Sequence, residues 1–116
     1  MKKATIVAMA MIICIIFTQS AFAGSCSDRG CTSRVKMMYT APYSEGKVSI
    51  ELKDVNPASA NCNPASDIYY TLYKDNIMFD KIFDQISAAA IMGNEVFFRI
   101  VEGSDDCEII YVKVWY

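Results

Sequence analysis

Two kinds of hydrophobic periodicity follow one another along this chain in an order that few small folds share. A helical period of three to four residues runs through residues 77–92. Patterns typical of β-strands occupy five other segments, 34–40, 48–53, 68–73, 95–101 and 108–116. The predicted order is therefore strand, strand, strand, helix, strand, strand. This order favours the five-stranded Greek-key barrel called the OB-fold, which binds oligosaccharides and oligonucleotides on one barrel face.

Side-chain alternation predicts which residues of these strands face the barrel interior. Val48, Ile50 and Leu52 alternate with polar residues without interruption. In the later strands the residues expected to face inward are Ile68, Tyr70, Leu72, Val96, Phe98, Ile100, Ile110, Val112 and Val114. The residues expected to face outward are Tyr69, Thr71, Tyr73, Phe97, Arg99, Ile109, Tyr111, Lys113 and Trp115. A one-residue error in the position of a strand would exchange its two faces.

The predicted helix carries one apolar side that we expect to pack on the barrel. Its members recur at steps of three and four residues and are Phe79, Ile82, Phe83, Ile86, Ala89 and Ala90. Asn76 is the predicted N-cap, Asp80 lies early, where the helix dipole favours a carboxylate, and Gly93 is the predicted stop.

Residues 1–23 have the three parts of a secretory signal peptide. Lys2 and Lys3 precede an apolar run over residues 4–17, and the segment ends in a small-x-small cleavage site at 21–23. A lipoprotein acylated at Cys26 is the alternative. Removing 23 of the 116 residues leaves 93, enough for a single domain over 24–116 in the periplasm or outside the cell. The apolar run is shorter than the ~20 residues that span a bilayer, so we predict no membrane span.

The mature segment contains four cysteines, which are Cys26, Cys31, Cys62 and Cys107. An even number in an exported chain predicts two disulfides, and three pairings are possible. We favour Cys26–Cys31, which closes a tight N-terminal loop, with Cys62–Cys107, which joins two loops between strands. The alternative is a zinc site, but without histidine or a Cys-x-x-Cys motif it would need all four thiolates. We therefore predict no metal and no cofactor.

Charge and composition argue against nucleic-acid binding and catalysis. The mature segment has 9 basic and 13 acidic side chains, and its basic residues are too dispersed to neutralise adjacent phosphates. The absence of histidine removes the commonest general base. The densest acidic cluster is Asp105, Asp106 and Glu108, which we interpret as a solvated loop with too few oxygens for calcium. We predict that the protein is not an enzyme.

The outward strand faces hold more large aromatic side chains than a small soluble surface usually exposes. Tyr69, Phe97, Tyr111 and Trp115 are the main examples. Exposed apolar patches above a few hundred Å² usually mark contacts, so these residues predict an interface, either with another copy of the chain or with a partner protein. The alternative is that the helix packs across some of them.

Nearly the whole mature segment resembles a known group of proteins. The likeness to small exported proteobacterial proteins of unassigned function rests on Cys31, the strand at 46–50, Cys62, the strand at 68–72, the alanine-rich helix ending at 93–96 and the segment 101–112. More distantly, the arrangement is similar to the pentameric binding subunit of subtilase cytotoxin. This resemblance implies an OB-fold that binds sialylated glycans, and it places Ser33 where that family has a glycan-contacting serine.

These observations support two functional hypotheses. The first is an exported, disulfide-stapled OB-fold binding module, oligomeric and glycan-recognising like toxin binding subunits. The second is a periplasmic structural or inhibitory protein that acts through contacts with other proteins. Ring assembly with glycan binding would favour the first hypothesis, and a monomer that captures an envelope protein would favour the second.

Overall fold

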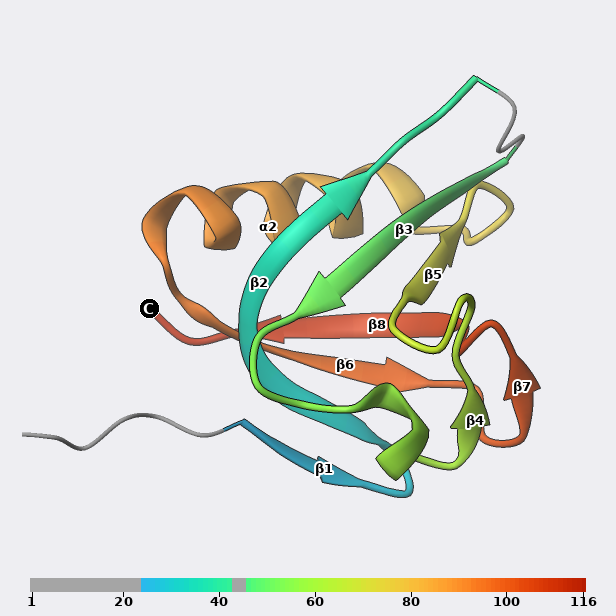
Figure 1. Cartoon of the computed structure of the whole chain (residues 1–116). Helices are drawn as coiled ribbons and strands as arrows, with labels where there is room; N and C mark the ends of the chain where they lie inside the picture. Colours follow the sequence, from blue (N-terminus) through green and yellow to red (C-terminus); the bar gives the residue numbers. More distant parts are fainter. Residues whose placement is uncertain (1–23, 43–45) are drawn as a thin grey trace, which may run out of the picture.

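The computed structural model describes residues 24–42 and 46–116, and the predicted signal peptide lies outside them (Figure 1). The described chain is mainly β with one α-helix, α2 (Phe79–Met92). Its strands are β1 (Ser25–Ser27), β2 (Gly30–Tyr39), β3 (Lys47–Leu52), β4 (Cys62–Asn63), β5 (Tyr70–Tyr73), β6 (Glu95–Ile100), β7 (Ser104–Asp105) and β8 (Ile109–Val114).

The described residues thus contain eight strands, not the five predicted. β2, β3, β5, β6 and β8 match the five predicted segments, with shifts at their ends. β1, β4 and β7 are only two or three residues long. Strands this short carry no detectable alternation, so periodicity could not reveal them. The order of long strands and helix is as predicted.

The main sheet is antiparallel, with neighbours in the order β5-β3-β2-β6-β8, and β1 pairs with the start of β2. β4 and β7 form a separate parallel pair. In Figure 1, β2 is long and strongly bent, and its register with β3 shifts between Val35 and Met37. No ladder joins β5 to β8 within the described chain. The two are linked by an isolated parallel bridge between Thr71 and Glu108, where the Thr71 N–H donates to the Cys107 carbonyl at 3.2 Å.

The interior face of the central strands agrees with the sequence prediction. Val96, Phe98 and Ile100 of β6 have no exposed surface, and the inward residues of β3 are buried as well. Phe98 makes an edge-to-face contact with Tyr70, with ring centroids 5.2 Å apart. Burial raises the pKa of the Tyr70 phenol. β3 and β6 each pair with a strand on both sides, so the alternation of their side chains determines which residues face the core.

Two predicted faces are wrong at the outer strands. Thr71, predicted outward, is fully buried, because Cys107 and Glu108 lie against β5 at this point. In β8, Ile109 is buried, whereas Ile110 is 44% exposed. The cause is a register shift in the β6–β8 ladder beside Ile100, which moves the first residue of β8 inward. Beyond this shift the prediction holds, since Val112 and Val114 pack against the core.

Ile68 was also predicted to face inward but is 39% exposed. It lies in a turn before β5, which begins at Tyr70, and its N–H donates to the Ala65 carbonyl at 3.2 Å. The alternation of the segment is real, but the strand includes only its last four residues.

The helix begins two residues later than predicted. Met78 occupies the N-cap position and makes no side-chain capping bond. The predicted cap, Asn76, accepts from the Met78 N–H at 2.9 Å and donates its amide to the carbonyls of Ile109 and Ile110. Asn76 therefore ties the turn before the helix to the start of β8. At the other end, Gly93 adopts the left-handed conformation and ends the helix as predicted.

The helix packs on the sheet with a narrower apolar side than predicted. Ile82, Ile86 and Ala89 are buried, Phe79 and Phe83 are half-buried, and Ala90 is exposed. Among the described helices, none combines the length and the apolar character that crossing a membrane requires.

Both favoured disulfides are confirmed. Cys26–Cys31 joins β1 to β2 at directly opposite positions, with Cα atoms 4.0 Å apart. Cys62–Cys107 joins β4 to the turn before β8 across 45 residues of sequence. Cys107 is fully buried, and its carbonyl is the acceptor that links β8 to β5. The second disulfide therefore fixes three chain segments at one place.

Candidate functional site

An aromatic surface lies on the outer side of β6 and β8. Phe97 of β6 and Tyr111 of β8 have ring centroids 6.5 Å apart, and the Lys113 ammonium lies 5.8 Å from the centre of the Phe97 ring. Tyr111 is 40% exposed and Trp115, just after β8, is 50% exposed. We call Phe97, Tyr111, Lys113 and Trp115 the aromatic face. It contains three of the four residues predicted to form an interface.

Strand pairing places these side chains on one side of the sheet. Phe97 lies opposite Lys113, and Trp115 continues β8 by donating its N–H to the Glu95 carbonyl at 3.1 Å. Gly30 on β2 completes the packing, because a Cβ there would lie 1.8 Å from the Phe98 carbonyl oxygen and 3.1 Å from the Phe97 ring. Only glycine allows β2 and β6 to approach this closely.

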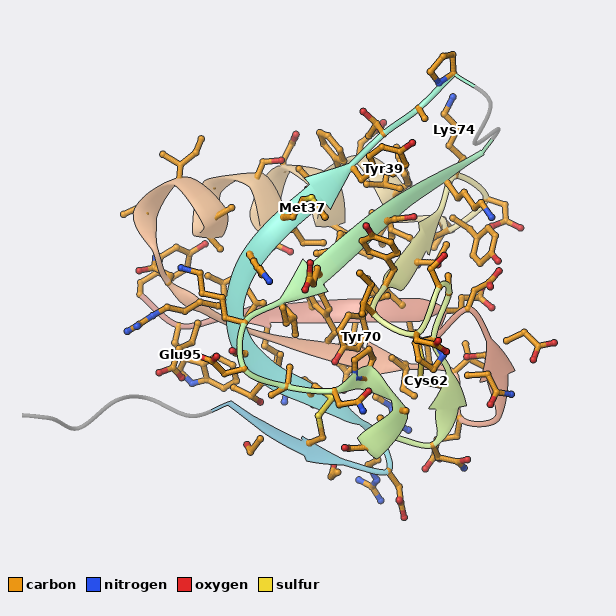
Figure 2. All side chains as sticks on the ribbon, viewed as in Figure 1. Met37, Tyr39, Cys62, Tyr70, Lys74 and Glu95 are labelled. Atoms are coloured by element: carbon orange, nitrogen blue, oxygen red, sulfur yellow. A yellow bond between two sulfur atoms is a disulfide. The ribbon has the colours of Figure 1, made fainter. Side chains whose placement is uncertain are left out.

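The aromatic face ends in a hollow of about 370 Å³ beside Trp115. Arg34, Gly93, Asn94 and Glu95 form the rest of its lining. Arg34 and Glu95 are paired positions of β2 and β6, so a guanidinium and a carboxylate flank the indole. The Asn94 amide nitrogen is buried without a hydrogen-bond partner within the described chain. Figure 2 labels Glu95 near the end of the molecule where α2 leads into β6. We call this pocket the Trp115 hollow.

Tyr69, the fourth residue predicted for the interface, does not join the aromatic face. It is half-buried in the turn before β5, where its N–H donates to the Ala65 carbonyl at 3.0 Å. β5 and β8 are the two ends of the strand order, so Tyr69 belongs to the other end of the sheet.

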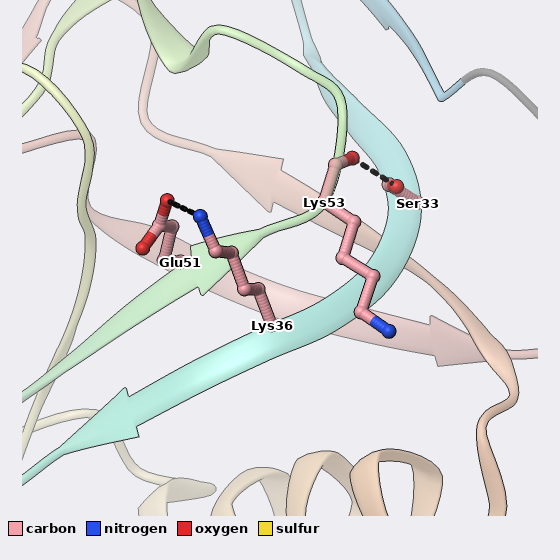
Figure 3. A network of polar contacts seen from close by, with 4 residues as sticks. All are labelled: Ser33, Lys36, Glu51 and Lys53. Atoms are coloured by element: carbon pink, nitrogen blue, oxygen red, sulfur yellow. Dashed lines mark hydrogen bonds and ion pairs between the residues drawn. The ribbon is translucent and has the colours of Figure 1, made fainter.

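Ser33, the predicted glycan contact, lies inside the fold. Its side chain is 1% exposed, and its hydroxyl donates to the Lys53 carbonyl (Figure 3). The neighbouring charged pair on the surface of the same two strands is Lys36 with Glu51, with 3.3 Å between nitrogen and oxygen. A ligand could accept or donate at the Ser33 hydroxyl only if the link between β2 and the end of β3 opened. The structure therefore gives this serine a role in joining the two strands.

The acidic cluster is engaged in holding loops together. Asp105 accepts from the Asn63 amide at 3.3 Å, which supports the β4–β7 pair. Asp106 accepts from the Tyr73 hydroxyl at 2.7 Å. This hydrogen bond, followed by burial and nearby carboxylate charges, raises the pKa of Tyr73 to about 12. Within the described residues, no group of three or more His, Cys, Asp or Glu side chains could hold a metal ion.

Sequence reasoning found the aromatic face but missed the hollow beside it. Arg34 and Glu95 are far apart in sequence and meet only because β2 pairs with β6. Asn94 follows the helix stop at Gly93, so its place beside Trp115 depends on where the helix ends. The hollow could have been predicted from the sequence only by pairing β2 with β6 in the correct register, which brings Arg34 opposite Glu95.

Comparisons with protein-family models, with curated proteins and with solved structures found no match.

Proposed function

We propose that this chain is an exported carbohydrate-binding module whose sugar site is the Trp115 hollow. The observation that carries the proposal is a half-exposed indole beside the charged side chains of Arg34 and Glu95 in one concave place. Binding sites for small ligands combine an apolar platform with a few placed polar groups. An indole stacks on a sugar ring, a guanidinium donates to its oxygens, and a carboxylate accepts from its hydroxyl groups.

We further propose that the fold is the five-stranded Greek-key barrel. Support comes from the neighbour order of the five long strands and from the bridge between Thr71 and Glu108. When this bridge is counted as a contact between β5 and β8, the order of neighbouring strands returns to its first strand and forms a ring. Barrels of this class carry ligand sites on one face and its flanking loops. The proposed barrel would give this chain the same fold that the resemblance to pentameric toxin binding subunits implies.

Export rests on two supports. Disulfides persist in oxidising compartments, and the described chain has two of them. Residues 1–23 have the pattern of a secretory signal. The proposed location is the periplasm or the extracellular space, and the proposed role is binding rather than catalysis.

A glycan array followed by calorimetry tests the sugar site. The Trp115→Ser variant should weaken binding of any glycan found on the array about tenfold, equivalent to about 1.4 kcal/mol. Tyr116→Ser is the matched control, since Tyr116 is a neighbouring aromatic that is 86% exposed and does not line the hollow. The control should bind as the wild type does. An array on which the folded wild type binds no neutral or acidic glycan would reject the proposal.

Contact with other copies of the chain is a second candidate function. Large apolar side chains are exposed at the end of α2, on β8 and after it; they are Ile91, Met92, Tyr111, Trp115 and Tyr116. Such a surface is typical of an interface. Native mass spectrometry of the wild type should then show an oligomer, and Tyr111→Ser with Trp115→Ser should give a folded monomer. A wild-type monomer at micromolar concentration would reject this second function and leave the glycan test intact.

A further inference from the structure

A second cavity lies at the opposite end of the helix from the Trp115 hollow. It is a groove of about 560 Å³. Its walls are the first turns of α2, the residues that follow β2, and the start of β3. The volume falls within the range of about 300–1,000 Å³ that is typical of small-ligand sites. We call it the hairpin groove.

Apolar side chains form the floor of the hairpin groove. Phe79 and Phe83 are one turn apart on α2, and their rings stack with centroids 6.0 Å apart. Both are half-buried and pack against the core, as does Val48 of β3, which is 5% exposed. Ala41 and Pro42 extend the apolar lining toward the tip of the hairpin. These groups offer a continuous surface for a hydrocarbon chain.

Two lysines stand at the rim of the groove. Lys47 begins β3 opposite Tyr73, and Lys74 follows Tyr73 directly, so the two backbones are adjacent. The Lys74 N–H also donates to the Gly46 carbonyl at 2.7 Å. Figure 2 labels Lys74 near the end of the molecule where β3 begins. Neither lysine ammonium has an ion-pair or hydrogen-bond partner within the described residues, where the ion pair found is Lys36–Glu51.

The charges around the groove favour an anionic guest. Asp80 is the acidic residue among the described lining residues, and its single negative charge compares with two positive charges on the lysines. The lining residues that the structure describes therefore carry a net positive charge next to an apolar floor. A neutral hydrocarbon would leave both ammonium groups without a partner, and a cation would meet like charges. An anionic head joined to an apolar tail matches both parts.

We propose that the hairpin groove binds a single-chain carboxylate amphiphile. The acyl chain lies along Phe79, Phe83 and Val48, and the carboxylate pairs with Lys47 and Lys74. The free, monomeric fatty acid is the proposed ligand. This inference is independent of the sugar site, because none of these residues lines the Trp115 hollow.

Three ten-carbon probes that differ only in the head group test this proposal. The probes are decanoate, decanol and decyltrimethylammonium, each titrated into labelled wild-type protein and followed by NMR. The two ionic probes stay below their micelle concentrations, and decanol stays below its solubility limit. The methyl signals of Ala41 and Val48 should shift with decanoate, while that of Ile100 in β6 should stay in place. Decanoate should bind about five- to tenfold more tightly than decanol, as two solvent-exposed ion pairs would give. Equal binding of all three probes, or no shift at Ala41 and Val48, would overturn the proposal.

Lysines outside the buried core supply variants that leave the core intact. Lys47→Gln with Lys74→Gln should remove the preference for decanoate over decanol. Lys53→Gln with Lys113→Gln is the matched control with the same change in net charge, and it should keep that preference. Added salt should weaken decanoate binding to the wild type and leave decanol binding unchanged. Loss of the preference in both double variants would show a general charge effect and reject the assigned site.

Discussion

Phe97 and Phe98 are neighbours in β6 with opposite surroundings. Phe98 has no exposed surface and contacts Tyr70 in the core. Phe97 is half-buried on the outer side, beside Tyr111 and under the Lys113 ammonium. The difference arises from the two-residue period of a strand, which sends successive side chains to opposite faces. One strand therefore serves two purposes, since its inner face fills the core and its outer face stays available to a partner.

The largest expected effect comes from truncating each phenylalanine in turn. Phe98→Ala should lower the free energy of unfolding by about 3–5 kcal/mol, as buried phenylalanine truncations do. Phe97→Ala should cost only about 1 kcal/mol, because part of that ring is already in water. Urea unfolding of both variants measures the difference. Equal losses would show that the outer face is part of the core.

The two disulfides extend the comparison to covalent links. Replacing Cys62 and Cys107 by serine should cost about 4 kcal/mol, and replacing Cys26 and Cys31 about 2 kcal/mol, because the longer loop restricts the unfolded chain more. Cys62–Cys107 also holds a buried residue that contacts β5, whereas Cys26–Cys31 holds β1 at the edge of the sheet. Thermal unfolding of both double variants decides the order, and a larger loss for the short loop would contradict it.

Ser33 provides a smaller test on β2. Ser33→Ala should cost about 1–2 kcal/mol, because the Lys53 carbonyl loses its donor. Thr32→Ala is the control on the opposite face and should change stability by no more than about 0.5 kcal/mol. If Ser33 instead contacts a glycan, as the family resemblance implies, Ser33→Ala should weaken glycan binding at unchanged stability. The melting temperature and the glycan affinity of the same variant separate the two roles.

A further test concerns the pH dependence of stability at the edge of the sheet. The Asp106 hydrogen bond raises the pKa of Tyr73 from 10.0 to about 12, so the folded state holds the phenol proton more tightly than the unfolded state does. This contribution is complete below the unfolded pKa and is lost as the pH rises through the folded value. Wild-type protein should therefore lose more stability than Tyr73→Phe between about pH 10 and pH 12. Urea midpoints across this range measure it, and identical pH profiles would exclude the link.

The sequence predicted the faces of strands that are paired on both sides. Val48, Ile50 and Leu52 alternate without error, and β3 needs no further information. Thr71 and Ile110 were assigned wrongly because their burial depends on a distant segment or on a register shift, which local alternation does not record. Loop contacts decide such positions.

The candidate site was predictable only in part, for a related reason. Phe97, Tyr111 and Trp115 follow from alternation along β6 and β8. Arg34 and Glu95 join them through the pairing of β2 with β6, which is a long-range contact. The Ser33 hydroxyl looks accessible in a sequence of polar residues, but Ser33 shares the buried face of β2 with Cys31 and Val35, and its hydroxyl donates to the backbone of Lys53. Hydrogen-bond partners of this kind are fixed by tertiary structure.

The connectivity of the two cystines has a consequence for how the chain matures. Synthesis delivers a chain from its N-terminus, so cysteines become available to an oxidant in sequence order. Among the described cysteines, Cys26 meets Cys31 first, and Cys62 then has no unpaired thiol to meet until Cys107 is made, nine residues before Tyr116. Both native bonds thus join cysteines that are consecutive in order of appearance. An oxidase that pairs thiols as they emerge reaches the native state without thiol–disulfide exchange.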